Sequence, residues 1–304
     1  MRICSLLPGA TEIAYALGLG DQIVGVTYEC DYPAEARNKR LVVRSSLDPE
    51  TMTSSEIDAR VRQTQRSGGS LYSLDVEAFK DASPDIVLTQ DLCDVCAINQ
   101  SEVVNACQSL PEQPAIVGLT PNRLTDVLAD IARVGAATGT EARARALVQN
   151  LRERIERVSE LASRSNSRPR VACLEWLDPI YYAGHWIPEM VELAGGQNGF
   201  GQTGRPSATL DWRSVLEFSP EIILAMPCGF DPERTISEFH LLQTRHGWSE
   251  LPAVKTNRVF AVDGHAYFSR PGPRLVDGLE LLVQLIHPDT FSLPASIQAA
   301  RRLE

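Results

Sequence analysis

The sequence predicts two α/β lobes, each built on a parallel β-sheet, joined by one long rigid helix. First, short apolar runs rich in β-branched residues alternate with helical patterns, which is typical of βαβ units. Second, this alternation occurs twice, in residues 1–139 and again in residues 166–304. Third, residues 140–165 between the two series have a helical and not a flexible composition. A chain of 304 residues is also long for one core.

The first lobe is predicted from short strands and the helices between them. We expect strands at residues 2–7, 22–27, 85–90 and 114–119. Such runs, bounded by turn residues, are typical of parallel strands buried on both faces. A helix should follow the first strand, with Thr11 as its N-cap and a stop at Gly18 and Gly20. A second helix is expected at 101–109. A third, at 54–65, is either an elaboration near the cleft between the lobes or, as we favour, a solvated surface excursion.

The second lobe repeats this alternation. We expect strands at residues 168–176, 221–227 and 258–263, and helices at residues 187–196, 237–243 and 273–286. The tail after Pro288 has no predicted structural role. Between the lobes, residues 140–163 carry an apolar stripe at helical spacing, with charge on the other faces. Its members are Leu147, Leu151, Ile155 and Val158. A continuous helix here would span about 36 Å at 1.5 Å per residue.

Charge and composition exclude several kinds of partner. The formal net charge is −10 and no lysine- or arginine-rich block is present, which argues against nucleic acid. No apolar segment approaches the roughly 20 residues that span a bilayer, so no membrane insertion is expected. The start of the sequence lacks the pattern of a secretory signal, and the seven cysteines are an odd number. Both observations predict a cytoplasmic protein with reduced thiols.

One pair of cysteines, Cys93 and Cys96, follows a predicted strand directly. A lone Cys-x-x-Cys is a weak zinc signal, because structural zinc usually takes four ligands. Two thiols in a polar loop beside Asp91 and Asp94 are nevertheless poor core material. We therefore interpret the pair as ligands of a bound molecule or of a metal ion such as Zn or Co. Cys30 is a third candidate metal ligand, although a small apolar filler is the interpretation that we favour for it.

Several stretches of the sequence are recognisable together: SLLPGATEIAYALGLGDQIVGVTYECDYPAEA, SPDIVLTQ, AGGQNGF, FSPEIILAM and YFSRPGPRLVDGLELL. They resemble the cobalamin-binding proteins of vitamin B12 uptake, which form the helical-backbone class of substrate-binding proteins together with siderophore and haem binders. The resemblance covers most of residues 1–288. It implies two Rossmann-like lobes, one long connecting helix, and a ligand cleft between the lobes. The implied ligand is a small molecule, either a corrinoid such as cobalamin or a related tetrapyrrole or metal chelate. We expect a monomer or a weak dimer.

Open α/β sheets bind ligands beyond the carboxyl ends of their strands, and this rule selects candidate residues in both lobes. In the first lobe the candidates are Pro8, Gly9, Ala10, Thr11, Tyr28, Glu29, Ser45, Ser46, Gln90 and Asp91. In the second lobe they are Trp176, Tyr181, Tyr182, His265, Tyr267, Phe268 and Arg270. Aromatic walls suit a flat apolar macrocycle. Arg270 would pair with a ligand oxygen, since the resemblance places its loop at the cleft; the alternative is a salt bridge that stabilises the lobes.

The resemblance also bears on a membrane partner. Exported members carry one surface glutamate on each lobe, and these dock on arginines of the permease. The first is retained at Glu77, whereas the second position falls near Arg213, which argues against permease docking. A tyrosine of the exported binders falls at Glu29, with Tyr28 adjacent, and a tryptophan falls near Ser207.

Two other kinds of function stay open. One is a metal-binding protein that uses Cys30, Cys93, Cys96 and a histidine, without a macrocycle. The other is a thiol-dependent enzyme on the same scaffold. None of the motifs G-x-S-x-G, phosphate-loop lysine or H-E-x-x-H is present, so we expect a binding protein and not an enzyme.

Overall fold

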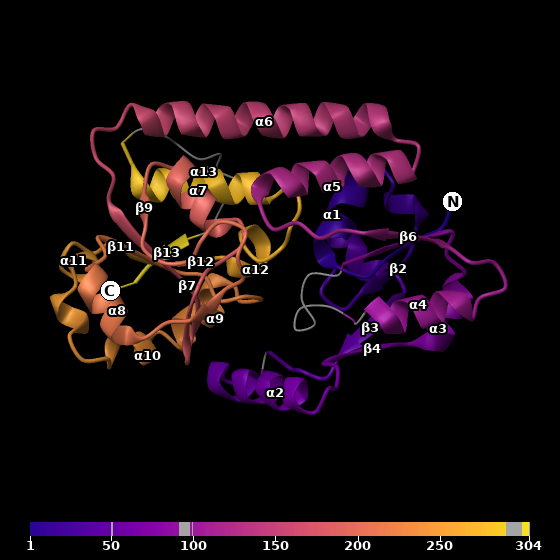
Figure 1. Ribbon diagram of the computed structural model, residues 1–304, viewed down its shortest axis with the longest axis horizontal. Helices are drawn as coiled ribbons and strands as arrows, with labels where there is room; N and C mark the ends of the chain where they lie inside the picture. The colour runs from indigo at the N-terminus through magenta and orange to yellow at the C-terminus, as the bar shows by residue number, and fades with distance from the viewer. Residues whose placement is uncertain (50, 91–97, 99, 290–299, 304) are drawn as a thin grey trace.

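The protein folds into two α/β lobes beneath one long helix, as Figure 1 shows. The computed structural model describes residues 1–49, 51–90, 98, 100–289 and 300–303. The long helix is α6 (Glu141–Ser163), which runs along both lobes. The fold class predicted from the sequence is therefore confirmed.

The first lobe contains a sheet whose strand order, among the described residues, is β4-β3-β2-β1-β5-β6. Its strands are β1 (Ile3–Ser5), β2 (Ile23–Thr27), β3 (Leu41–Ser45), β4 (Tyr72–Leu74), β5 (Ile86–Thr89) and β6 (Ala115–Gly118). Its helices are α1 (Pro8–Ala16), α2 (Ser54–Arg66), α3 (Val76–Ala82), α4 (Gln100–Gln108) and α5 (Leu124–Ala137), with short 3-10 turns at Gly20–Gln22 and Ala34–Asn38. The edge strand β4 runs antiparallel to β3, and the other pairs are parallel.

The second lobe has the strand order β10-β8-β7-β11-β12-β13 among the described residues, with β9 paired to β7. Its strands are β7 (Arg170–Leu177), β8 (Ile180–Tyr182), β9 (Gln197–Asn198), β10 (Ala208–Thr209), β11 (Ile222–Ala225), β12 (Val259–Val262) and β13 (Ala300–Arg302). Its helices are α7 (Ile187–Leu193), α8 (Trp212–Phe218), α9 (Pro232–Ser237), α10 (His240–Gln243), α11 (Pro252–Lys255), α12 (Gly264–Tyr267) and α13 (Leu275–Ile286), with a 3-10 turn at Trp248–Glu250.

Both sheets are mixed, which corrects the expectation of purely parallel sheets. In the second lobe β7, β11 and β12 are parallel, while β8, β10 and β13 add antiparallel edges. The tail also has a role, because β13 pairs with β12. Antiparallel edge strands need no crossover helix, so they leave no βαβ pattern in the sequence.

The first helix begins earlier than predicted. Thr11 was expected to be the N-cap, but α1 starts at Pro8, whose fixed φ and missing N–H suit the first helical position. Thr11 lies inside α1 with no exposed surface, and its hydroxyl donates to Ser5 Oγ at 2.8 Å. The hydroxyl therefore satisfies a buried contact with β1 and does not cap the helix.

The connecting helix α6 is attached to both lobes. The side chain of Ile155 packs against the core clusters of both. Toward its amino end, Arg143 donates to the carbonyl oxygen of Leu17 in the first lobe at 2.7 Å. Further along, Arg154 donates to Glu280 in the second lobe at 2.8 and 2.7 Å. These contacts fix the orientation of both lobes against one rigid rod.

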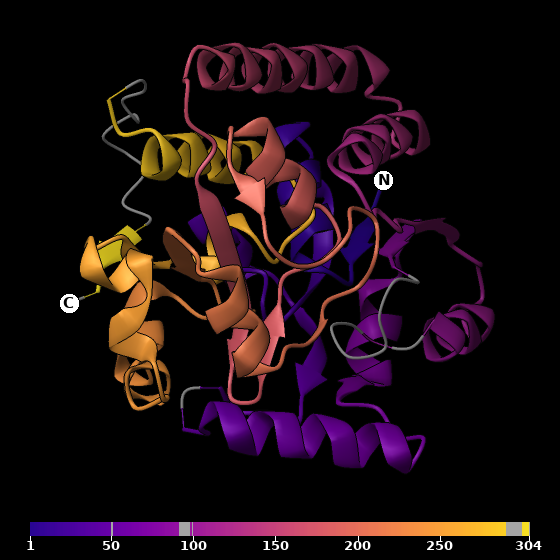
Figure 2. The same cartoon turned by 60° about the vertical axis from the view of Figure 1, so that its left-hand side comes forward.

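The helix α2 starts in the first lobe and reaches the second, as Figures 1 and 2 show. Its bounds agree with the predicted helix to within one residue. Its interpretation as a solvated excursion is wrong, because Ser54 has no exposed surface and donates to Glu238 of the second lobe at 3.0 Å. The amino end of α2 thus lies in an interface between the lobes.

Candidate functional site

Charged side chains from both lobes meet where the loop after β2 contacts the loop after β12. Arg270 is only 4% exposed, and its guanidinium donates to Asp31 at 2.5 Å and to the carbonyl oxygen of Glu29 at 2.8 Å. His265 Nε2 lies 2.9 Å from the other carboxylate oxygen of Asp31. Glu29 and Asp31 belong to the first lobe and the two cationic residues to the second, so these contacts join the lobes.

A second ion pair lies beside the first. Arg274 donates to both carboxylate oxygens of Glu12, at 2.6 and 3.1 Å, and its guanidinium lies 3.9 Å from the ring centroid of Tyr32. Burial raises the pKa of the Glu12 carboxyl, and the hydrogen bond from Arg274 opposes that rise. We refer to these ion-pairing residues as the interlobe seam. Its members are Glu12, Asp31, His265, Arg270 and Arg274.

The backbone of α1 is part of the same contact. A Cβ atom on Gly9 would lie 2.6 Å from the carbonyl oxygen of Pro271, so the close approach of the lobes requires glycine there. Ala10 and Thr11 are fully buried. Three of the four predicted ligand residues at the start of α1 are therefore buried, Gly9 at the junction of the lobes and the other two inside the first lobe, and only Pro8 is partly exposed. Arg270 likewise makes the salt bridge that was its alternative.

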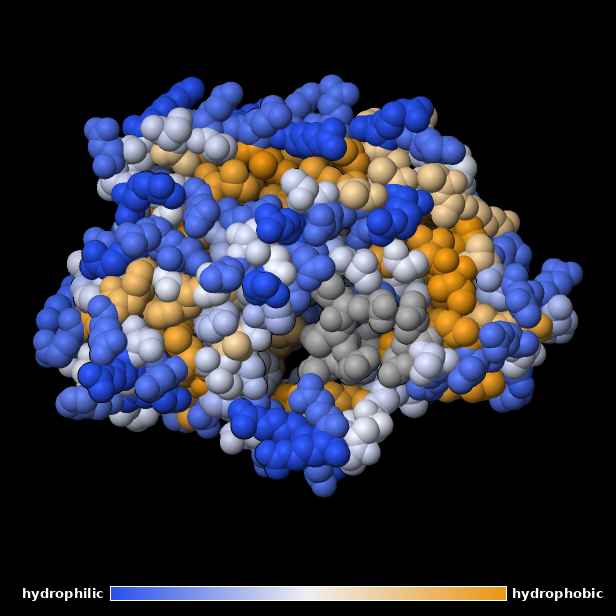
Figure 3. All heavy atoms as spheres, in the orientation of Figure 1, coloured by the Kyte–Doolittle hydropathy of each residue, from blue (hydrophilic) through white to orange (hydrophobic). Residues whose placement is uncertain are grey.

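Between the lobes, above α2 in this view, the surface is hollowed, as Figure 3 shows. Each lobe has a pair of aromatic side chains near the strand ends that lie toward the other lobe. Tyr28 follows β2 and stacks on Tyr72 with ring centroids 6.2 Å apart. Trp176 lies near the end of β7, 5.2 Å from the ring of Phe230, and its indole donates to the carbonyl oxygen of Ser54 in α2 at 3.2 Å. Each lobe thus has an aromatic side chain, Tyr28 or Trp176, at a strand end near the other lobe.

The polar groups of the first wall are already bonded within the lobe. The hydroxyl of Tyr28 donates to Glu29 Oε1 at 2.8 Å, and burial raises the pKa of Tyr28, so it remains a neutral donor. Ser45 ends β3, and its hydroxyl accepts from the backbone N–H of Leu47 at 2.9 Å. The hydroxyl of Ser46, which follows β3, donates to the carbonyl oxygen of Leu71 at 3.1 Å. Gln90 directly follows β5 and is 8% exposed.

The remaining aromatic candidates of the second lobe separate into two groups. Tyr181 reaches α2, where its hydroxyl donates to Asp58 at 3.3 Å, and Tyr182 is a half-buried member of β8. Phe268 is 3% exposed and packs in the core of its own lobe, with Tyr267 packed against the same cluster. Tyr181 thus contacts α2, whereas Tyr267 and Phe268 support the loop that carries Arg270.

The thiol candidates are only partly described. Cys93, Cys96 and Asp91 lie outside the described residues, so their predicted role stays a prediction. Cys30 is 3% exposed, and its sulfur lies 3.0 Å from Thr11 Oγ1. Burial raises the pKa of the Cys30 thiol, which favours the neutral filler over a metal ligand. Within the described part of the chain, no group of three or more His, Cys, Asp or Glu side chains is placed to hold a metal ion.

Comparison with known proteins identifies the family. The family model described as periplasmic binding protein matches residues 3–266, which is most of the chain. The chain belongs to the periplasmic binding protein family. An uncharacterised ABC transporter substrate-binding lipoprotein of Bacillus subtilis is 29% identical over 299 residues, covering 95% of this chain and 81% of that protein. The vitamin B12-binding protein of Vibrio cholerae is 26% identical over 281 residues, covering 92% and 86%.

Solved structures of this family share the fold. The periplasmic vitamin B12-binding protein of Vibrio cholerae superimposes with a TM-score of 0.68 at 23% identity, covering 94% of this chain and 96% of the other. A periplasmic haem-binding protein of Pseudomonas aeruginosa gives a TM-score of 0.73 at 17% identity, covering 96% of this chain and 95% of the other.

Among the described residues of this member of the periplasmic binding protein family, no helix is both long and apolar enough to cross a bilayer.

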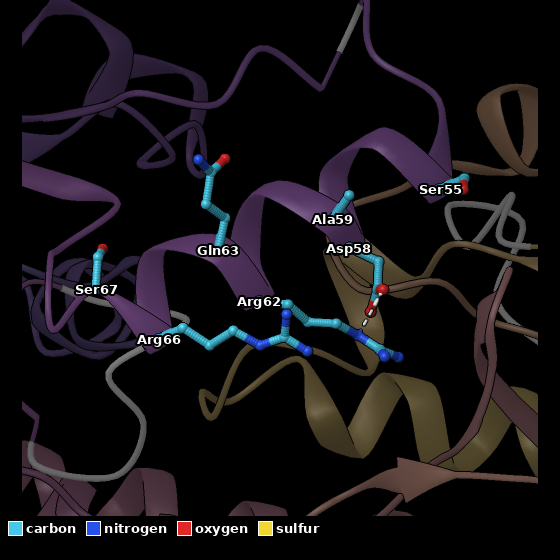
Figure 4. A pocket seen from close by; sticks show the side chains of 7 residues that line it. All are labelled: Ser55, Asp58, Ala59, Arg62, Gln63, Arg66 and Ser67. Carbon is cyan, nitrogen blue, oxygen red and sulfur yellow. Dashed lines mark ion pairs between the residues drawn. The ribbon is translucent and has the colours of Figure 1, made fainter.

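Two surface pockets lie away from the strand ends of this periplasmic binding protein. One, of about 570 Å³, lies along the face of α2 opposite the buried Ile57, as expected from 3.6 residues per turn (Figure 4). Its described lining is Ser55, Asp58, Ala59, Arg62, Gln63, Arg66 and Ser67. Arg62 pairs with Asp58 at 2.7 Å, and Asp58 also accepts a hydrogen bond from Tyr181 of the second lobe, so this face is polar. The other, of about 580 Å³, lies between α5, α6 and α7.

Sequence reasoning missed two of the acidic partners in these contacts. Glu12 and Glu238 were not predicted, although each binds a side chain or backbone group of the opposite lobe. Asp31 falls within residues 28–31, which the rule for strand ends selects, but its pairing with Arg270 was not predicted. Glu12 had a usable signal, because it is a carboxylate within the apolar pattern of α1, and a charge at such a position requires a buried partner. Glu238 lies in a polar stretch and had no comparable signal.

Proposed function

We propose that this protein binds a corrinoid such as cobalamin, or a related tetrapyrrole, in the hollow between its lobes. The observation that carries the proposal is a partly exposed aromatic side chain at the strand ends of each lobe: Tyr28, which stacks on the buried Tyr72, and Trp176, which packs on the buried Phe230. A flat, largely apolar ligand needs aromatic walls and few polar groups. The names of the related vitamin B12-binding and haem-binding proteins support the same class of ligand.

Titration with two probes tests the proposal. Cyanocobalamin and haemin would each be mixed with the purified protein, and the absorbance spectrum and co-elution in gel filtration recorded. We expect at least one probe to bind with a Kd of about 1 μM or tighter, near −8 kcal/mol. Unchanged spectra and separate elution for both probes would overturn the proposal.

A matched pair of tryptophan variants locates the site. Trp176→Leu should weaken binding by at least about tenfold, because it removes one aromatic wall. Trp212→Leu is the control, since the ring of Trp212 on α8 stacks on Trp248 with centroids 6.1 Å apart, within the second lobe. Equal affinities of the two variants would place the ligand elsewhere.

We also propose that the protein works in a reducing compartment, the cytoplasm, with free thiols. The odd number of cysteines and the five described free cysteines support this. Thiol titration of denatured, unreduced protein should then detect most of the seven thiols, whereas three intact disulfides would contradict the proposal.

The two positions that bear on permease docking are both exposed: Glu77 on α3 is 86% exposed and Arg213 on α8 is 82% exposed. Their opposite charges argue against docking through two matched glutamates.

A further inference from the structure

The helix α2 is attached to both lobes, although its sequence position is within the first. It lies between β3 and β4, and Val61 packs against an apolar cluster of the first lobe. Its first turn, in contrast, contacts the second lobe. Figures 1 and 2 show α2 crossing the gap between the lobes on the side away from α6. The helix therefore borders the hollow of Figure 3 opposite the connecting helix.

The contact with the second lobe is centred on Glu238, at the end of α9. Its side chain is 6% exposed and accepts hydrogen bonds from the backbone N–H of Ser54, at 3.0 and 3.3 Å, and from the Ser54 hydroxyl. Arg234 pairs with the same carboxylate at 2.6 Å and donates to the carbonyl oxygen of Met52 at 2.7 Å. A carboxylate at the first turn of a helix satisfies free N–H groups and is stabilised by the helix dipole.

Among the described residues, hydrogen bonds link α2 to the second lobe. In addition to the hydrogen bonds that Glu238 accepts, there are two others. Trp176 donates to the carbonyl oxygen of Ser54, and Tyr181 donates to Asp58. Within the described residues, neither apolar cluster of the second lobe contains a side chain of α2. Polar contacts exchange for water at little net cost, whereas separation of an apolar interface exposes surface to water. The amino end of α2 can therefore leave the second lobe more easily than the lobes can separate.

We propose that α2 is a latch over the ligand hollow and that Glu238 is the positioning residue that sets the rate of ligand exchange. The proposal rests on the proposed function, since the hollow must hold the ligand. Trp176 connects the two roles: its ring forms an aromatic wall and its indole N–H holds the first turn of α2. When the Glu238 contact is lost, α2 detaches at its amino end, the hollow opens, and the ligand leaves faster.

Hydrogen exchange tests the latch without any ligand. Peptides covering residues 53–66 would be followed by mass spectrometry in wild type, Glu238→Ala, Glu238→Gln and Glu233→Ala. Glu233 is the matched control, because it lies on the same α9 with 66% of its side chain exposed. We expect exchange in this segment to be at least about tenfold faster in Glu238→Ala, partly restored in Glu238→Gln, and unchanged in Glu233→Ala. Peptides of β1 and α1 report whether each variant is folded. If Glu238→Ala does not fold, Glu238→Gln, which keeps the shape, is compared with wild type alone.

Ligand dissociation tests the consequence. The dissociation rate of the bound probe, cyanocobalamin or haemin, should rise at least about tenfold in Glu238→Ala, which corresponds to about 1.4 kcal/mol. If Glu238 only stabilised the fold, Glu238→Ala would lower the melting temperature and leave the dissociation rate of the probe unchanged. Unchanged segment exchange in a folded variant, or faster segment exchange with an unchanged dissociation rate, would overturn the proposal. If neither probe binds wild type, the proposed function is wrong, and so is the role of Glu238 in ligand release. Amide hydrogen exchange still decides whether Glu238 holds α2.

Discussion

Replacement of Asp31 by asparagine removes one charge from the interlobe seam while it keeps the size of the side chain. Removal of one partner from a buried ion pair typically costs about 3–5 kcal/mol, because the other charge remains buried without compensation. Three features reduce that figure here. The Asp31 side chain is 23% exposed, Glu12 stays 3.6 Å from Arg270, and the asparagine oxygen can still accept one hydrogen bond. We therefore expect a loss of about 2 kcal/mol in the free energy of unfolding at pH 7.

Urea unfolding is the assay, with Asp81→Asn as the control. Asp81 pairs with Arg40 at 3.1 Å on the surface of the first lobe, where its side chain is 72% exposed. Such exposed pairs contribute about 0–1 kcal/mol. The control should therefore stay within about 0.5 kcal/mol of wild type. If Asp31→Asn also stays within that range, the seam does not hold the lobes together.

The effect of Asp31→Asn should depend on pH in one direction. Burial acts to raise the pKa of Asp31, but the hydrogen bond from His265 and the charge of Arg270 outweigh it, so the pKa of Asp31 lies well below its ordinary value. The stabilisation is therefore fully present above the unfolded-state pKa of about 3.9 and is lost as the pH falls toward the folded-state pKa. The difference between wild type and variant should be constant from about pH 6 to 8 and shrink below about pH 4. A difference that grows on acidification would contradict this reasoning.

Three further predictions follow from particular contacts. The lobes should move little on ligand binding, so small-angle scattering curves with and without ligand should nearly superimpose; a large drop in the radius of gyration would show a hinge. Gly9→Ala should lower the free energy of unfolding by about 1–3 kcal/mol, because the added methyl group would overlap the carbonyl oxygen of Pro271. An unchanged urea midpoint would show that the two lobes can move apart enough to accept the methyl group. The double variant Cys93→Ser with Cys96→Ser should keep the fold and weaken ligand or metal binding by at least about tenfold; unchanged binding in the folded variant would leave recognition to the aromatic walls.

The sequence predicts the parts of this fold that depend on local pattern. The helical stripe of α6 is confirmed, since Leu151 and Val158 are buried and Ile155 packs against both lobes. Buried parallel strands are likewise recognisable, because two buried faces require a continuous apolar run. The short antiparallel edge strands were missed, because strands of two or three residues, such as β8 and β10, are too short to show an alternating pattern.

Contacts between the lobes could be predicted less well, because they depend on residues far apart in the chain. The helix at Ser54–Arg66 was predicted within one residue, yet its partner Glu238 lies 184 positions away from Ser54. The same holds for Arg270 and Asp31, which are 239 positions apart. Arg270 was correctly expected at the face between the lobes, but the choice between ligand contact and salt bridge required the position of its carboxylate.

The lobes are joined in three ways, and these differ in the physical cost of separation. Along α6, apolar side chains cross the boundary: Leu124 and Val127 of α5 pack in the core of the second lobe, and Val276 of α13 packs in that of the first. At the seam, Arg270 and Arg274 make several ion pairs and hydrogen bonds with the first lobe, and all of these would have to break together on separation. At α2 the described contacts with the second lobe are hydrogen bonds, which water can replace. A ligand should therefore enter by release of α2 and not by rotation of the lobes, so binding should change the hydrogen exchange of residues 53–66 while the radius of gyration stays constant.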